Sequence, residues 1–179
     1  MSEKVLVLGL SKSGISAAKF LRKKGYEVYL TESKPDVDTE KVSELKELGI
    51  NVEYGGHSEK YVSGSSFAVT SPGIPPKSEI IRKLYEKNIP VISEIELAYK
   101  NTKTPFITIT GTNGKTTTTA LVSHILSRKY KAPCCGNIGV PPTSLIDEYN
   151  DYLVCEISSY QAAMTKDFKP LISCWTNFT

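Results

Sequence analysis

The sequence has few cysteines and histidines, and none of them has the spacing of a metal-ligand set. No pair of cysteines forms a CxxC motif, and the two histidines, His57 and His124, stand alone. The chain therefore offers no cysteine–histidine metal site, and we expect the cysteines to be reduced and mostly buried. The four cysteines are Cys134, Cys135, Cys155 and Cys174.

The sequence also lacks a large excess of one charge and any long apolar run. The 22 basic and 19 acidic residues give a net charge of +3, and no run of like charges forms a nucleic-acid patch. Residues 1–10 contain only a short apolar run, which is too short for a signal sequence or a membrane span. We therefore expect a cytosolic protein that binds neither nucleic acid nor a membrane.

Short apolar runs alternate with segments of helical periodicity through the first hundred residues. Turns of two to six residues separate them, which is typical of a parallel sheet with helices on both faces. The first part of the chain is therefore predicted to be a Rossmann-like α/β domain. The predicted strands are 5–9, 27–30, 50–54, 67–70 and 90–92, and the predicted helices are 15–25, 39–48, 78–87 and 93–99.

The pattern restarts after the polar stretch 100–104, so we predict two domains, 1–101 and 102–179. The second part has the start of a P-loop α/β ATPase domain but only about 75 residues, fewer than such a core needs. We expect an incomplete sheet with an unpaired edge and exposed apolar surface. Its predicted elements are strands 105–110, 152–157 and 171–175, a helix over 116–126 and a short helix opening at 141–142.

A glycine-rich loop joins the first predicted strand and helix of the second domain. The segment reads TGTNGKTT, and converging backbone N–H groups at a helix N-terminus would bind phosphate oxygens. Lys115 can reach the terminal phosphates, and Thr116 stands where such loops hold Mg²⁺. The strict P-loop pattern fails at Ile109, and a plain turn with an exposed lysine is the alternative. The predicted ATP-binding residues are Gly111, Thr112, Asn113, Gly114, Lys115, Thr116 and Thr117.

Two further segments could belong to the same site. Glu156 ends an apolar strand, at the edge where open α/β sheets bind ligands, and is a candidate Mg²⁺ ligand. By itself, a glutamate at a strand end is more often only solvated. Asn137 lies between two glycines in the segment GNIG, which on its own predicts a loop turn.

The N-terminal turn carries a degenerate dinucleotide motif. In the segment GLSKSG, Ser11 replaces the second glycine of GxGxxG, which argues against standard NAD binding. Glu32, at the end of the second predicted strand, could contact a ribose or a base. Residues 71–73 read SPG, which locally is an ordinary Pro-Gly turn.

Taken together, these segments resemble the Mur ligase family. TGTNGKTT is the form of the phosphate loop in Mur ligases and folylpolyglutamate synthetases, and the segments EISSYQ, GNIG and SPGI also match the family in order. The resemblance implies an ADP-forming ligase that activates a carboxylate as an acyl phosphate, which an amine then attacks. It also implies ATP and Mg²⁺ as cofactors.

The resemblance assigns roles to individual residues. It implies catalytic roles for Lys115 and Glu156, with Mg²⁺ held at Thr116 and Glu156. The first domain would hold the UDP part of the substrate. The implied UDP-substrate contacts are Lys12, Ser13, Glu32, Ser33, Lys34, Gly73, Asn137 and Ser158.

Within the family, the SPG turn and the Rossmann-like start favour the members that add D-glutamate to UDP-N-acetylmuramoyl-L-alanine. The implied partners are that precursor, ATP and D-glutamate, and the complete enzyme is expected to be a monomer. Residues 176–179 resemble the start of a segment that continues to a metal-binding histidine. The carbamylated lysine and the C-terminal amino-acid-binding domain are also implied to lie beyond it, so we expect these 179 residues alone to be inactive.

Other interpretations remain open. The first domain could be a UDP-sugar-binding or NAD(P)-binding Rossmann module, and the chain could belong to another Mur ligase type. A P-loop kinase or regulatory nucleotide-binding module would account for residues 111–117 only.

Overall fold

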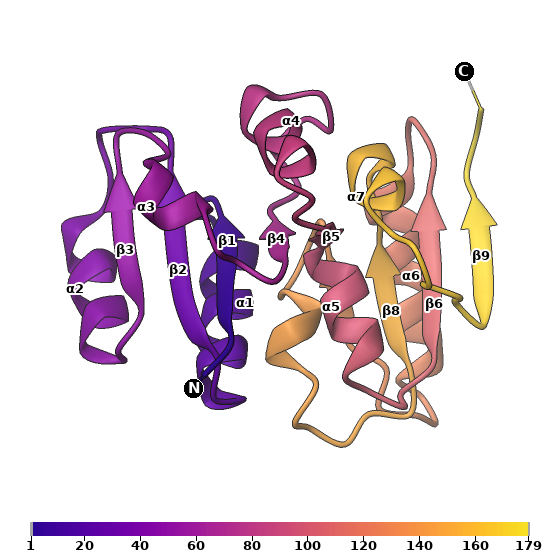
Figure 1. Ribbon diagram of the computed structural model, residues 1–179. Helices are drawn as coiled ribbons and strands as arrows, with labels where there is room; N and C mark the ends of the chain where they lie inside the picture. Colours follow the sequence, from indigo (N-terminus) through magenta and orange to yellow (C-terminus); the bar gives the residue numbers. More distant parts are fainter. Residues whose placement is uncertain (1, 179) are drawn as a thin grey trace. The chain divides into compact units, whose positions relative to one another are not determined.

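Two parallel sheets organise the chain, and each belongs to its own unit (Figure 1). The structure is a computed structural model that describes residues 2–178, so the predicted C-terminal segment is described only as far as Phe178 and its last residue lies outside the described part. The units divide between Glu94 and Ile95. Every strand pair is parallel, and the predicted α/β class is confirmed.

The first sheet has the strand order β3-β2-β1-β4-β5. Val5, Leu6, Val7 and Leu8 of the central strand β1 are completely buried, because an all-parallel sheet is covered on both faces. Their continuous apolar run was the sequence signal for this strand. The strands are β1 (Lys4–Leu8), β2 (Glu27–Glu32), β3 (Asn51–Tyr54), β4 (Ala68–Thr70) and β5 (Val91–Ser93).

Helices connect these strands, close to the positions that the periodicity predicts. The Asp38 side chain caps α2 by accepting hydrogen bonds from the backbone N–H groups of Glu40 and Lys41. The helix α3 was not predicted, because its four residues are too few to show a period of 3.6. The helices are α1 (Lys12–Lys23), α2 (Thr39–Glu47), α3 (Glu59–Val62) and α4 (Glu79–Glu86).

The second sheet has the order β7-β8-β6-β9 and includes one strand that the sequence analysis treated as loop. That strand, β7, has three residues and runs directly into the GNIG turn. Three residues are too few to show the alternation of a strand, and the neighbouring glycines and asparagine are typical of a turn. The strands are β6 (Phe106–Thr110), β7 (Cys134–Gly136), β8 (Leu153–Glu156) and β9 (Ile172–Trp175). The helices are α5 (Glu94–Lys100), α6 (Lys115–Leu126), the short 3₁₀ helix η1 (Pro142–Ser144) and the unpredicted α7 (Ser159–Ala163).

Alternate residues of β6 pack against different helices. Phe106 lies in one apolar cluster with Ile95 of α5, whereas Ile109 lies in another with Val122 of α6. Since successive strand residues point to opposite faces, α5 and α6 cover opposite faces of this sheet. This packing explains why the units divide before most of α5, seven residues earlier than the predicted boundary at 101.

The edge of the second sheet is apolar and exposed. Strand β9 lies at this edge, and Ile172 and Trp175 are 53% and 61% exposed. Leu121 and Ile125 of α6 are also more than half exposed. Within residues 2–178, the expected unpaired edge and exposed apolar surface are therefore confirmed. None of the helices in residues 2–178 is long and apolar enough to span a membrane.

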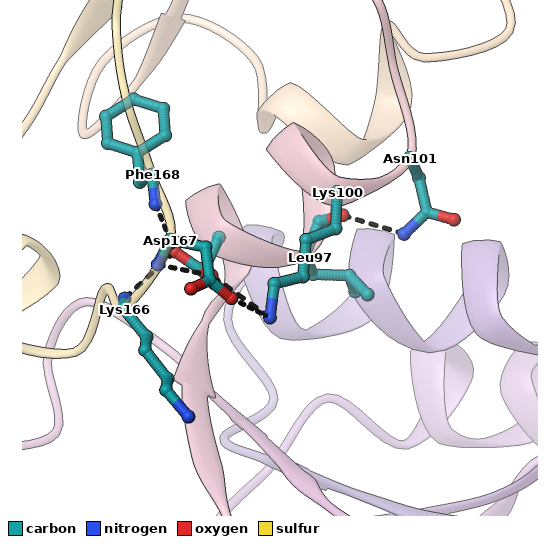
Figure 2. Close-up of polar contacts among 7 residues, drawn as sticks. Leu97, Lys100, Asn101, Lys166, Asp167 and Phe168 are labelled. Atoms are coloured by element: carbon teal, nitrogen blue, oxygen red, sulfur yellow. Dashed lines mark hydrogen bonds and ion pairs between the residues drawn. The ribbon is translucent and has the colours of Figure 1, made fainter.

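A buried carboxylate ties the segment before β9 to α5. The Glu96 side chain is completely buried and accepts hydrogen bonds from the backbone N–H groups of Lys166, Asp167 and Phe168, at 3.0 to 3.1 Å. The Lys100 ammonium pairs with both Glu96 and Asp167, at 3.2 and 2.8 Å. Figure 2 shows this segment facing the helix that carries Lys100. One side chain thus holds the connection between α7 and β9.

Replacing this carboxylate should destabilise the second unit. We expect Glu96→Ala to lower the free energy of unfolding by about 3 kcal/mol, because three backbone N–H groups lose a charged acceptor. Glu96→Gln should have a smaller effect, since an amide keeps one acceptor oxygen. Urea unfolding followed by the fluorescence of Trp175, the single tryptophan, measures this directly.

The matched control is Glu148→Ala, which removes an exposed ion pair with Lys131 and should change stability little. Equal unfolding midpoints for Glu96→Ala and this control would contradict the structural role of Glu96.

Candidate functional site

The glycine-rich loop adopts a conformation that only glycine readily takes at two positions. Gly111 and Gly114 have φ angles of +135° and +79°. Gly114 is the N-cap of α6, and no side chain caps that helix. The first-turn N–H groups of a twelve-residue helix are therefore available to bind an anion, with the helix dipole favouring negative charge.

Part of the loop is held by the chain itself. The Asn177 side-chain oxygen accepts hydrogen bonds from the backbone N–H groups of Thr112 and Asn113, at 3.0 and 3.1 Å. The Lys115 ammonium donates to the carbonyls of Gly111 and Thr112. Asn177 thus fixes the outer part of the loop, a role that sequence reasoning did not assign to it, and leaves the N–H groups at the start of α6 for a ligand.

Glu156 brings three of the predicted site residues together. Its carboxylate is 1% exposed, and its two oxygens accept hydrogen bonds from the Thr116 hydroxyl and the Asn137 amide nitrogen, both at 2.8 Å. The backbone N–H of Asn137 also donates to the carbonyl of Glu156, at 2.9 Å. The phosphate loop, the GNIG turn and the end of β8 therefore meet at one carboxylate.

This carboxylate has no basic partner among residues 2–178. A buried carboxylate without a cation is costly, so a cation bound beside it would be strongly stabilised. The donor set of Glu156 and Thr116 consists of hard oxygen ligands, which suit Mg²⁺. Since no group of three potential metal-binding side chains occurs in the described part, the remaining ligands would come from phosphates and water.

A cavity of about 530 Å³ opens beside the phosphate loop. Its walls include Lys115, Ser158, Trp175 and Phe178. The Ser158 side chain caps α7 by accepting a hydrogen bond from the backbone N–H of Gln161. The cavity thus has the loop on one side and a pair of stacked aromatic rings, Trp175 and Phe178, on another.

The first unit has its own cavity, of about 510 Å³, at the carboxyl ends of β1, β2 and β4. The structure brings four of the predicted UDP contacts together there, namely Glu32, Ser33, Lys34 and Gly73. Lys12 and Ser13 do not line this cavity. Lys12 is exposed at the start of α1, and Ser13 is buried within that helix.

The degenerate glycine motif has a structural explanation. Ser11 caps α1 by accepting a hydrogen bond from the backbone N–H of Gly14, and its hydroxyl donates to that of Ser71. A Cβ atom on Gly14 would lie 2.0 Å from the carbonyl oxygen of Gly9, so the last glycine is required by close packing. The serine thus occupies the helix N-terminus where a dinucleotide pyrophosphate would bind.

Glu32 shapes the turn around it. It accepts hydrogen bonds from the backbone N–H groups of Leu10 and Lys34 and from the Ser33 hydroxyl. Burial raises the pKa of Glu32, but these hydrogen bonds outweigh burial and hold the pKa below its usual value. The carboxylate is therefore ionised at neutral pH and links the β1 and β2 ends of the cavity.

Sequence reasoning did not identify His57 as a site residue. The histidine lies in the loop after β3 and lines the same cavity as Glu32 and Gly73. No motif surrounds it, and the only available signal was its position just after a strand of the same parallel sheet, at the edge where β2 also ends.

Comparisons with known proteins match a separate Mur ligase domain to each part of the chain. The family profile described as Mur ligase MurD-like, N-terminal domain, matches residues 3–93, and the profile described as Mur ligase middle domain matches residues 109–179. A UDP-N-acetylmuramoylalanine–D-glutamate ligase of Geobacillus sp. (strain WCH70) is 41% identical over 97% of this chain. One of the same name from Thermoanaerobacter pseudethanolicus is 40% identical over 99% of it. The chain spans 40% of the length of each of these relatives.

A solved structure supports the fold. The UDP-N-acetylmuramate:L-alanyl-gamma-D-glutamyl-meso-diaminopimelate ligase of Neisseria meningitides has a TM-score of 0.59 and 15% identity, over 97% of this chain and 60% of that one. Since the two Mur ligase profiles account for most of the sequence, one for each unit, this chain belongs to the Mur ligase family.

Proposed function

We propose that this chain provides the UDP-binding and ATP-binding parts of a ligase that joins D-glutamate to UDP-N-acetylmuramoyl-L-alanine in peptidoglycan synthesis. The names of the relatives at about 40% identity support this pair of substrates. The observation that carries the proposal is the convergence of Thr116 and Asn137 on the buried carboxylate of Glu156.

The second unit would bind ATP. The N–H groups at the start of α6 and the Lys115 ammonium would hold the β- and γ-phosphates, while Glu156 and Thr116 would hold Mg²⁺. The bound cation would neutralise charge on the transferring phosphoryl group. This arrangement suits the formation of an acyl phosphate, a step that depends mainly on positioning and charge stabilisation. We assign no residue of this chain to D-glutamate.

The first unit would bind the UDP part of the precursor. Its cavity combines the Lys34 cation, the polar turn at Ser33 and the backbone of Gly73, which are suitable contacts for a diphosphate and a ribose. In the second unit, Asn137 and Ser158 would contact the UDP substrate. We also propose that the complete protein acts as a cytoplasmic monomer and has no nucleic-acid partner.

Two other functions explain fewer of the observed contacts. An NAD(P)-binding module would need the helix N-terminus that Ser11 already caps. A UDP-sugar-binding protein without chemistry would leave the buried Glu156 and its hydroxyl and amide partners unexplained.

The UDP assignment predicts selective binding. In calorimetric titrations, UDP-N-acetylmuramoyl-L-alanine and UDP should bind this chain, whereas NADH should not, because Ser11 blocks the pyrophosphate position. Lys34→Ala should weaken UDP binding about tenfold through the loss of one charge contact to a phosphate. Binding of NADH in preference to UDP would contradict the assignment.

The ATP assignment predicts that two substitutions, made in the complete protein, cause different kinetic defects. Lys115→Ala should lower the kcat of D-glutamate ligation by about 100-fold or more, because the phosphoryl group loses a positive charge. Glu156→Gln should raise the Mg²⁺ concentration needed for half-maximal rate, since a neutral amide is a poorer ligand. Phosphate release measures both effects.

The matched control is Lys103→Ala, which removes an exposed lysine of the same unit and should leave kcat unchanged. A Glu156→Gln enzyme with an unaltered Mg²⁺ requirement would show that this carboxylate does not hold the cation.

A further inference from the structure

His57 lies in a loop that is fastened to the segment after β2. The backbone N–H of Gly55 donates to the carbonyl of Lys34 at 3.1 Å, and that of Gly56 donates to the carbonyl of Glu32 at 3.2 Å. The imidazole is half-buried and forms part of the cavity wall, together with Glu32 and Ser33. Its position is therefore set by the same strand ends that build the proposed UDP site.

The hydrogen bonds around Thr31 assign the tautomer of His57. The completely buried Thr31 hydroxyl lies 2.9 Å from a Glu53 carboxylate oxygen, 2.9 Å from the Gly56 carbonyl oxygen and 2.9 Å from Nδ1 of His57. The hydroxyl has a single proton. A carboxylate and a carbonyl can only accept, so the proton goes to one of them, and the hydroxyl must accept a hydrogen bond from Nδ1–H of His57.

A neutral imidazole protonated at Nδ1 has a lone pair at Nε2. Burial lowers the pKa of His57, although the nearby Glu53 and Glu32 carboxylates oppose this shift, and the lowered pKa favours the neutral ring. Nε2 has no hydrogen-bond partner among residues 2–178. His57, which lines the cavity, therefore carries a hydrogen-bond acceptor that no described residue uses.

The topology indicates which part of a nucleotide meets this acceptor. In a Rossmann-like sheet a residue at the end of β2 contacts the ribose of the bound nucleotide. His57 follows β3, the next strand outward in the order β3-β2-β1. We therefore expect the base of a bound nucleotide to lie beyond the ribose position, on the side of β3.

We propose that Nε2 of His57 accepts a hydrogen bond from the imide N–H at position 3 of uracil, so that this residue selects the base of the nucleotide substrate. The proposal rests on the UDP-binding function proposed above. Cytosine has an unprotonated nitrogen at the same position, and two facing acceptors repel. His57 would thus favour uridine over cytidine nucleotides, a choice that depends on the Thr31 hydroxyl.

The test compares UDP with 3-methyluridine 5′-diphosphate, which lacks the N–H but has the same phosphates and ribose. By calorimetry, the unmodified chain should bind UDP about fivefold to tenfold more tightly than the methylated ligand. In His57→Ala this ratio should fall to about 1. The control is His124→Ala, which removes the only other histidine, on α6 in the second unit, and should keep the original ratio.

A second measurement needs no ligand and no change at His57. Nitrogen-15 NMR of the histidine ring should show Nδ1 protonated and Nε2 unprotonated, and Thr31→Val should remove this preference. A proton found on Nε2 would overturn the proposal.

The binding results separate this proposal from the function on which it rests. If UDP binds but the methylated ligand binds equally well, or if the ratio persists in His57→Ala, the role of His57 is refuted and the UDP site stands. If a folded sample binds neither ligand, the UDP site itself is refuted, and the role of His57 with it.

Discussion

The second unit depends on one buried carboxylate. Glu156 is nearly inaccessible to solvent, and each of its oxygens accepts a hydrogen bond from a different segment, one from the phosphate loop and one from the GNIG turn. Burial of a carboxylate is tolerated only when such partners or a cation compensate for lost hydration. The same interaction thus holds three segments in place and leaves a local negative charge beside a helix N-terminus that attracts phosphate. Structure and proposed chemistry depend on the same residue.

Acidic side chains hold loops in both units, but their surroundings differ. Glu96 accepts three backbone hydrogen bonds and pairs with Lys100, so its charge is compensated within the chain. Glu32 accepts hydrogen bonds from two backbone N–H groups and a hydroxyl, yet borders a cavity. Glu156 has no basic partner in the described part of the chain. Of the three, it is therefore the one suited to receive a metal ion.

Local sequence patterns identified the residues of each segment but not all of their contacts. Asn137 was predicted as a contact for the sugar nucleotide, and its side chain lies on Glu156. Asn177 was known only as part of a terminal segment, and it satisfies two N–H groups of the phosphate loop. His57 belonged to no motif. These contacts join residues between 19 and 65 positions apart, or lie in loops without periodicity, so no local pattern could indicate them.

The sequence by itself determined the α/β class, most of the strands and helices, and the phosphate loop, because apolar periodicity and glycine turns are local properties of the chain. It also indicated that Glu156 ends a strand beside that loop. Tertiary structure alone decided which polar groups share each carboxylate, and which residues line each cavity. It also placed Nδ1 of His57 beside the buried Thr31 hydroxyl. These features depend on the register of parallel strands, which brings distant residues to one sheet edge.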